Sequence, residues 1–175
     1  MSDIPKREYI YLDNAATSFP KPPAVAEETA RFIRDIGSNI KRGNYQPAYQ
    51  AEERVLDMRL ALSALFGHDD ARRVLFSQNI TVALNQILQG FLRPGDHVLI
   101  SSLEHNAVLR PLQQLTRRGV GFDRIPCGQD GAMRLEALPG LLKPNTRALV
   151  INHASNVGGT VQPLDGLGAF CRAHD

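Results

Sequence analysis

The sequence of 175 residues lacks several features that define whole classes of protein. It has no tryptophan and two cysteines, Cys127 and Cys171, which are too few for a disulfide framework or a zinc site. Its 20 basic residues oppose 18 acidic ones, and a net charge of +2 is too small to indicate a polyanionic partner. We therefore expect no structural disulfide, no bound metal and no nucleic-acid partner.

Long hydrophobic runs are also missing. Residues 1–6 contain no apolar segment of the kind found in signal peptides, and no run approaches the roughly 20 apolar residues of a membrane span. Hydrophobic residues make up 43% of the chain and charged residues 22%, as in ordinary globular proteins. These values predict one domain with a real core, a cytoplasmic location and no membrane partner.

The first 70 residues contain one strand signal and two helix signals. A strand is expected over Tyr9–Leu12, and the pair Pro22-Pro23 favours a helix start, with an end at Gly37. A second helix is expected from Pro47 to Gly67. Apolar residues recur along it at three- and four-residue spacing and are expected to pack in the core, namely Ala48, Ala51, Val55, Met58, Leu62 and Leu65.

Strand and helix signals then alternate. We expect strands over residues 73–76, 97–101, 120–125 and 147–151, and helices over 80–92, 107–118, 134–142 and 164–174. This alternation predicts an α/β fold with a mainly parallel sheet and helices on both faces. The strand over 147–151 would leave an unpaired sheet edge, which is a liability for aggregation or dimerisation.

Ligands of open parallel sheets bind beyond the carboxyl ends of the strands. After the strand over 73–76, the segment Ser77–Thr81 starts a helix, where backbone N–H groups and the Thr81 hydroxyl suit a phosphate. The alternative is that Asn79 simply caps the helix.

Two further strand ends carry polar side chains. His105 can stack on a flat ligand, move a proton or bind a metal, although no second His or Cys has ligand-like spacing; the alternative is a loop histidine beside an asparagine cap. Asn156 can donate an amide hydrogen bond, and Gly158-Gly159 permits a sharp turn. A phosphate cradle, a ring stacker and a ring-oxygen donor together match pyridoxal phosphate. The sequence lacks the glycine-rich motifs that bind dinucleotides and the phosphates of Walker-type nucleotides, so these ligands are less favoured.

Three segments, 11–17 (YLDNAAT), 102–106 (SLEHN) and 153–160 (HASNVGGT), give the chain its strongest resemblance. It resembles the class V aminotransferase family, and within it the cysteine desulfurase and selenocysteine lyase branch. The resemblance runs from about Tyr9 to the end with the motifs in the family's order. It implies the large domain of a pyridoxal-phosphate-dependent transferase of fold type I, incomplete at the C-terminus.

The resemblance also implies roles for individual residues. The Ile80 backbone and Thr81 would hold the phosphate of pyridoxal 5'-phosphate, His105 would stack on its ring and move protons, and Asn156 would bond its phenolic oxygen. The substrate pocket would be lined by Asn14, Ala15, Ala16 and Arg42. One departure is that Ile80 stands before Thr81 where the family usually has a small residue, and Val82 follows where the family has Glu.

By the same resemblance, residues 1–46 form an N-terminal arm, helix and pocket loop, and residues 47–175 a partial cofactor-binding domain. The implied reaction removes sulfur from cysteine, a small amino acid, to give alanine and a persulfide. A homodimer and a sulfur-acceptor protein are the implied partners. None of the four lysines has the setting of the lysine that attaches the cofactor covalently. The alternatives are an aminotransferase, epimerase or other lyase of the family, or a non-catalytic truncated paralogue.

Overall fold

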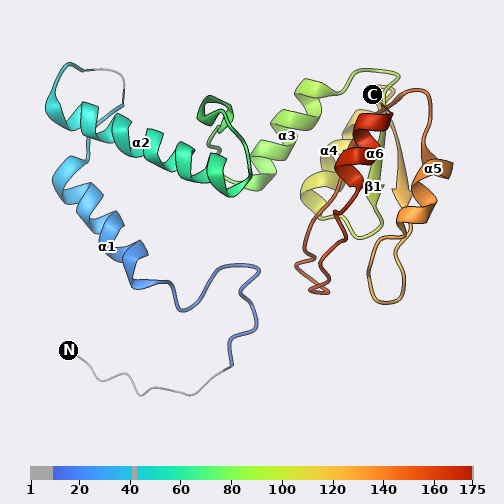
Figure 1. Ribbon diagram of the computed structural model, residues 1–175, viewed down its shortest axis with the longest axis horizontal. Coiled ribbons are helices and arrows are strands. Elements are labelled where there is room, and N and C mark those ends of the chain that lie inside the picture. The colour runs from blue at the N-terminus through green and yellow to red at the C-terminus, as the bar shows by residue number, and fades with distance from the viewer. Residues whose placement is uncertain (1–9, 41–42, 175) are drawn as a thin grey trace. The chain divides into compact units, whose positions relative to one another are not determined.

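The computed structural model describes residues 10–40 and 43–174, and Figure 1 shows the order of its helices and strands. The chain divides into two compact units at the boundary between Phe76 and Ser77, and each unit is described by itself. The boundary expected between residues 46 and 47, which would separate the N-terminal arm from the cofactor-binding domain, stays a prediction.

The first helix of the first unit ends at a glycine, as predicted. α1 (Pro23–Arg31) begins at the second proline of the Pro22-Pro23 pair and continues as a π-helical turn, η1 (Phe32–Ile36). Gly37 then takes a left-handed φ of 39°, and a Cβ there would lie 2.8 Å from the carbonyl oxygen of Ile33. Only glycine fits this end without strain.

The second helix is also confirmed, but its packing is not as predicted. α2 (Gln46–Leu65) buries Ala48 and Ala51, whereas Met58 is 57% exposed and Leu65 is 74% exposed. The expectation that the whole apolar stripe lies in a core is therefore wrong within this unit. A helix about 30 Å long offers more apolar surface than the short elements of the unit can cover.

Two predicted strands are not found. Residues 10–12 of the segment Tyr9–Leu12 are irregular. In the segment Arg73–Phe76, Arg73 ends a 3₁₀ turn, η2 (Ala71–Arg73), and the apolar residues after it have no partner strand among the described residues, so Leu75 is 81% exposed. Both segments have strand-forming residues, but a strand exists only where another strand accepts its hydrogen bonds.

The sheet of the second unit is parallel, as predicted. Its described strands are β1 (His97–Ser101), β2 (Gly121–Ile125) and β3 (Thr146–Val150), in the order β2-β1-β3. The central strand pairs His97 with Gly121 on one side and with Thr146 on the other. Within the described residues β3 pairs with β1 on one side only, and the unpaired edge expected there stays a prediction.

Helices cover both faces of this sheet, which confirms the predicted fold class (Figure 1). Val98 and Ile100 of β1 pack against α3 (Ile80–Phe91) and α4 (Asn106–Thr116). Leu99, which points to the opposite face, packs with residues of η3 (Leu135–Ala137), α5 (Leu138–Leu141) and α6 (Leu167–Ala173). Because all five residues of β1 are buried, this strand is the centre of the core.

A buried histidine of the central strand lies against side chains of both neighbouring strands. His97 of β1 is 2% exposed, and its Nδ1 lies 2.9 Å from Oγ1 of Thr146 in β3. Its Nε2 lies 3.3 Å from Oδ2 of Asp123 in β2, which also receives Nζ of Lys143 at 2.7 Å. Burial, helped by the charge of Lys143, lowers the pKa of His97, and the hydrogen bond from Lys143 lowers the pKa of Asp123.

We predict that the second unit loses stability as the pH falls below the ordinary histidine value of about 6.5. The folded pKa of His97 lies below the unfolded one, so the unfolded chain binds more protons in that range. Urea unfolding, followed by the methyl resonance of Ile100, should therefore show lower stability at pH 5.5 than at pH 7.5. His97→Gln should flatten this dependence, while the exposed control His174→Gln should retain it. Equal pH dependence in the wild type and His97→Gln would contradict the assignment.

Candidate functional site

The amino-terminal end of α3 offers hydrogen-bond donors. Asn79 is in an extended conformation, and its Oδ1 accepts the N–H of Val82 at 2.9 Å, so the predicted cap is confirmed. Among the described residues the N–H groups of Ile80 and Thr81 and the Thr81 hydroxyl have no hydrogen-bond acceptor. The cap and an anion site are thus compatible, because one cap satisfies only part of the first turn.

His105 itself caps α4, which differs from the expectation of a histidine beside an asparagine cap. Its Nδ1 accepts the N–H of Ala107 at 3.0 Å, and Asn106 is the first helical residue. In the neutral ring the hydrogen must therefore lie on Nε2. The capping bond fixes the orientation of an exposed imidazole at the carboxyl end of β1.

Thr81 and His105 line one cavity of about 420 Å³ between α3 and α4. The structure thus brings together two residues 24 positions apart that the sequence had nominated separately. The other lining residues are Asn85, Asn106, Ala107, Arg110, Pro111 and Gln114. Sequence reasoning missed Arg110, although its four-residue spacing from Asn106 and Gln114 marks a polar stripe on an otherwise apolar helix.

Asn156 lies at the tip of a closed hairpin that follows β3. The N–H of Ser155 donates to the Thr160 carbonyl at 2.9 Å, and the N–H of Gln162 donates to the His153 carbonyl at 2.7 Å. Gly159 has φ 72°, which is the sharp turn expected from the glycine pair. Asn156 is exposed and does not line the cavity that contains Thr81 and His105.

A buried amide holds this hairpin on the neighbouring loop. Gln162 is 3% exposed; its Oε1 accepts the N–H of Met133 at 2.8 Å, and its Nε2 donates to the Gly131 carbonyl at 2.9 Å. Gly131 has φ 78°, and a Cβ there would meet the Thr160 hydroxyl at 2.7 Å. Sequence reasoning missed Gln162, because its partners lie about 30 residues away and no local pattern reveals them.

The predicted substrate residues near the N-terminus belong to the first unit. Asn14 Oδ1 accepts the N–H of Phe19 at 3.1 Å, and Ala15 and Ala16 lie exposed in the turn that follows Asp13. Arg42 lies outside the described residues. Their role in a substrate pocket stays a prediction.

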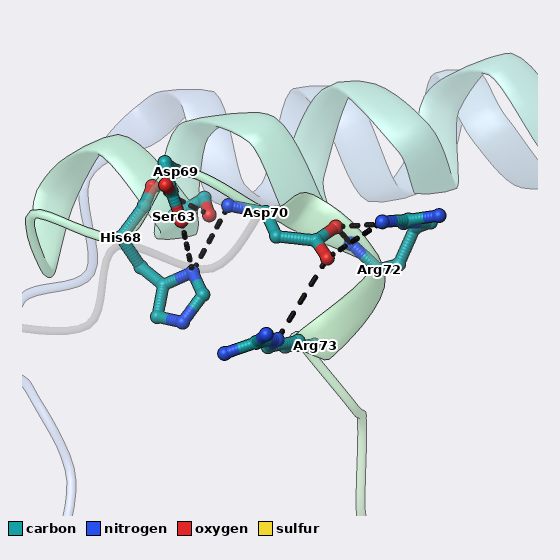
Figure 2. Close-up of polar contacts among 6 residues, drawn as sticks. All are labelled: Ser63, His68, Asp69, Asp70, Arg72 and Arg73. Carbon is teal, nitrogen blue, oxygen red and sulfur yellow. Dashed lines mark hydrogen bonds and ion pairs between the residues drawn. The ribbon is translucent and has the colours of Figure 1, made fainter.

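A second group of Ser, His and Asp residues, shown in Figure 2, is a turn and not a catalytic relay. The Ser63 hydroxyl donates to the backbone carbonyl of His68, not to its ring. The His68 ring accepts the N–H of Asp70, whose carboxylate holds the side chain of Arg72 with two hydrogen bonds of 2.9 Å. The Arg72 side chain thereby lowers the pKa of Asp70. These bonds close the chain reversal after α2.

The described residues contain no cluster of His, Cys, Asp or Glu that could hold a metal ion. Cys127 and Cys171 are both free thiols. Of the helices in the described part of the chain, none is long and apolar enough to cross a membrane.

Comparison with known proteins gives consistent results. The sequence model of the family described as aminotransferase class-V matches residues 10–175. A curated protein named cysteine desulfurase from Salmonella newport (strain SL254) is 34% identical over an alignment of 169 residues that covers 94% of this chain and 41% of that protein. A protein of the same name from Escherichia coli O8 (strain IAI1) gives the same values.

Solved structures show the same relationship. The apo structure of a cysteine desulfurase from Thermococcus onnurineus NA1 has a TM-score of 0.84 at 24% identity, over 94% of this chain and 42% of that one. A cysteine desulfurase from Escherichia coli in an S-sulfonic acid form has a TM-score of 0.77 at 28% identity, with the same coverage. The chain therefore spans about two fifths of the length of the relatives it matches.

We predict that the cap at Asn79 is needed for the order of the α3 start. Asn79→Ala should destabilise the second unit by about 1 kcal/mol, because the Val82 N–H loses its acceptor. Asn79→Asp, which keeps a side-chain oxygen at this position, should retain most of the stability. The measurement is the urea midpoint of each variant, and equal midpoints for Asn79→Ala and the wild type would refute the role of the cap.

Proposed function

The chain belongs to the aminotransferase class-V family, and on this basis we propose that it is the amino-terminal part of a pyridoxal-phosphate-dependent cysteine desulfurase. The observation that carries the proposal is the shared cavity of Thr81 and His105. These are the two residues to which the family resemblance assigns the phosphate and the ring of the cofactor.

The donor set at the start of α3 fits a phosphate group. The free N–H groups of Ile80 and Thr81, the Thr81 hydroxyl and the positive end of the helix dipole all favour an anion with several acceptor oxygens. Arg110 adds a cation to the lining of the same cavity. We assign phosphate binding to Ile80 and Thr81.

The ring of His105 suits a planar partner. Its Nδ1 is bonded to the backbone, so the imidazole cannot rotate freely, and its Nε2–H remains available to donate or relay a proton. We assign to His105 the stacking contact with the cofactor ring, the exclusion of water from that ring face and proton movement at Nε2. Asn156 would donate its Nδ2–H to the phenolic oxygen of the cofactor.

Bound pyridoxal phosphate supplies an electron sink that stabilises negative charge at the substrate α-carbon. We propose cysteine as the substrate, with alanine and a persulfide as products, because the curated relatives are named cysteine desulfurases. Asn14, Ala15, Ala16 and Arg42 would line the substrate pocket. The lysine that attaches the cofactor would lie in the part of the relatives' length that this chain does not span.

The proposal extends to the organisation of the protein. Residues 1–46 would serve as an arm with pocket residues, and residues 47–175 as the first part of the cofactor domain. We also propose that the protein forms a homodimer, has a sulfur-acceptor protein as a partner and is located in the cytoplasm. These parts rest on the family resemblance.

Activity is the direct test of the proposed reaction. The protein encoded by the complete reading frame that contains this chain should release sulfide and alanine from cysteine in the presence of pyridoxal phosphate and a thiol reductant. Sulfide should form in a one-to-one ratio with alanine. Transfer of the amino group to a 2-oxo acid without release of sulfide would support an aminotransferase instead.

We predict that Thr81→Ala weakens the binding of pyridoxal phosphate to this chain by roughly 10-fold or more, since a hydrogen bond to a charged group contributes about 1.5–3 kcal/mol. Equilibrium dialysis measures the affinity, and inorganic phosphate should compete. Thr116→Ala is the matched control, because Thr116 lies at the far end of α4 and its hydroxyl bonds only to the Gln113 carbonyl among the described residues. Unchanged affinity in Thr81→Ala would remove Thr81 from the site.

We predict that the ring of His105 is needed for turnover in the complete protein. His105→Asn should lower kcat by about 10²- to 10⁴-fold, the usual contribution of a positioned proton-transfer group. Asn keeps a side-chain acceptor for the α4 cap, so the melting temperature should change little. His105→Ala should lose both the ring and the cap. Full activity of His105→Asn with an unaltered cofactor spectrum would show that the assignment is wrong.

A further inference from the structure

Glu104 is a buried carboxylate without a cationic partner among the described residues. The residue is 8% exposed although the residues on both sides of it, Leu103 and His105, are exposed. Its Oε1 accepts two hydrogen bonds, while its Oε2 is buried and has no partner in the described part of the chain. Burying a polar oxygen without a hydrogen-bond partner opposes folding, so stability alone does not account for this side chain.

The two bonds that Glu104 does make join two neighbouring strands of the sheet. The Ser101 hydroxyl, at the end of β1, donates to Oε1 at 2.7 Å. The backbone N–H of Asn152, two residues beyond β3, donates to the same oxygen at 2.7 Å. Glu104 is thus a bridge between the carboxyl ends of β1 and β3, at the edge where parallel-sheet proteins bind ligands.

Both residues joined by this bridge are close in the chain to a residue of the proposed site. His105 follows Glu104 in the chain, and the Asn152 end opens the hairpin whose tip is Asn156. The other end of that hairpin is already held by the amide of Gln162. The pairing of β1 with β3 ends at Ile100 and Val150, and the contact with Glu104 extends this link to Asn152 at the near end of the hairpin.

We propose that Glu104 is a positioning residue, whose carboxylate oxygen sets the place of the His105 turn and of the Asn156 hairpin relative to each other. This inference rests on the proposed cofactor site. It goes beyond that site because Glu104 is not one of the proposed cofactor contacts but would control the positions of two of them, His105 and Asn156.

Two substitutions of Glu104 distinguish the effect of side-chain length from the effect of charge. Glu104→Gln keeps an oxygen acceptor at the same distance and removes the charge. Glu104→Asp keeps the charge but withdraws it by one methylene, about 1.5 Å, which breaks both bonds. The matched control is Glu136→Asp, which shortens an exposed carboxylate that forms an ion pair with the side chain of Arg134.

The first measurement needs no ligand. Amide hydrogen exchange by NMR should be roughly 10-fold or more faster at Asn152 in Glu104→Asp than in the wild type, with shifted resonances at Asn156. It should stay within about 3-fold in Glu104→Gln and in the control. The second measurement is the affinity for pyridoxal phosphate by equilibrium dialysis, which should fall roughly 10-fold in Glu104→Asp and be retained in Glu104→Gln.

Wild-type exchange and affinity in Glu104→Asp would overturn the proposal. So would a loss of affinity in Glu104→Gln with unchanged exchange at Asn152, because the charge and not the position would then matter. If Glu104→Asp does not fold, Glu104→Gln decides alone, since retained exchange and affinity support positioning and their loss overturns it. If the wild type binds no pyridoxal phosphate, the proposed function fails, and the exchange comparison still decides whether Glu104 positions the hairpin.

Discussion

The candidate site depends on the burial of β1 on both faces. Val98 and Ile100 face one helical layer and Leu99 faces the other, so the strand cannot shift by one residue without moving apolar side chains to the wrong side. Its register with β2 and β3 places the ends of the strands at one edge. Ser101, Glu104 and Asn152, at or just beyond the ends of β1 and β3, meet at this edge.

Sequence patterns predicted the second unit well, because its signals are local. Strand lengths, the glycines after helices and the cap at Asn79 each depend on residues within one turn of the chain. The strand predicted over Arg73–Phe76 is not found, and the reason is different. The composition of this segment is that of a strand, but the existence of a strand depends on a partner that no local pattern reveals.

The same distinction holds for the site. Thr81 and His105 could be nominated from sequence because each lies beyond a segment with strand signals, residues 73–76 and 97–101, and the structure places both in one cavity. Glu104 and Gln162 could not be nominated, because the contacts that link them to other elements are with residues tens of positions away, such as Asn152 and Gly131. Residues that would touch a ligand left a local signature, whereas residues that hold them in place left none.

The contact between Gly131 and Thr160 bears on how this protein could be varied in the laboratory. A side chain at Gly131 would be strained by its left-handed backbone and would also collide with the Thr160 hydroxyl, which donates to the Asp130 carbonyl at 2.9 Å and so helps hold the hairpin on this loop. At Gly128 an added Cβ would meet mainly a side-chain oxygen of Asp130, which could move only by giving up its hydrogen bond from the Ala132 N–H. A combinatorial library of this loop should therefore randomise the positions before Gly131 and keep that glycine invariant. The library would then vary the sequence of the loop and keep its contact with the hairpin that carries Asn156.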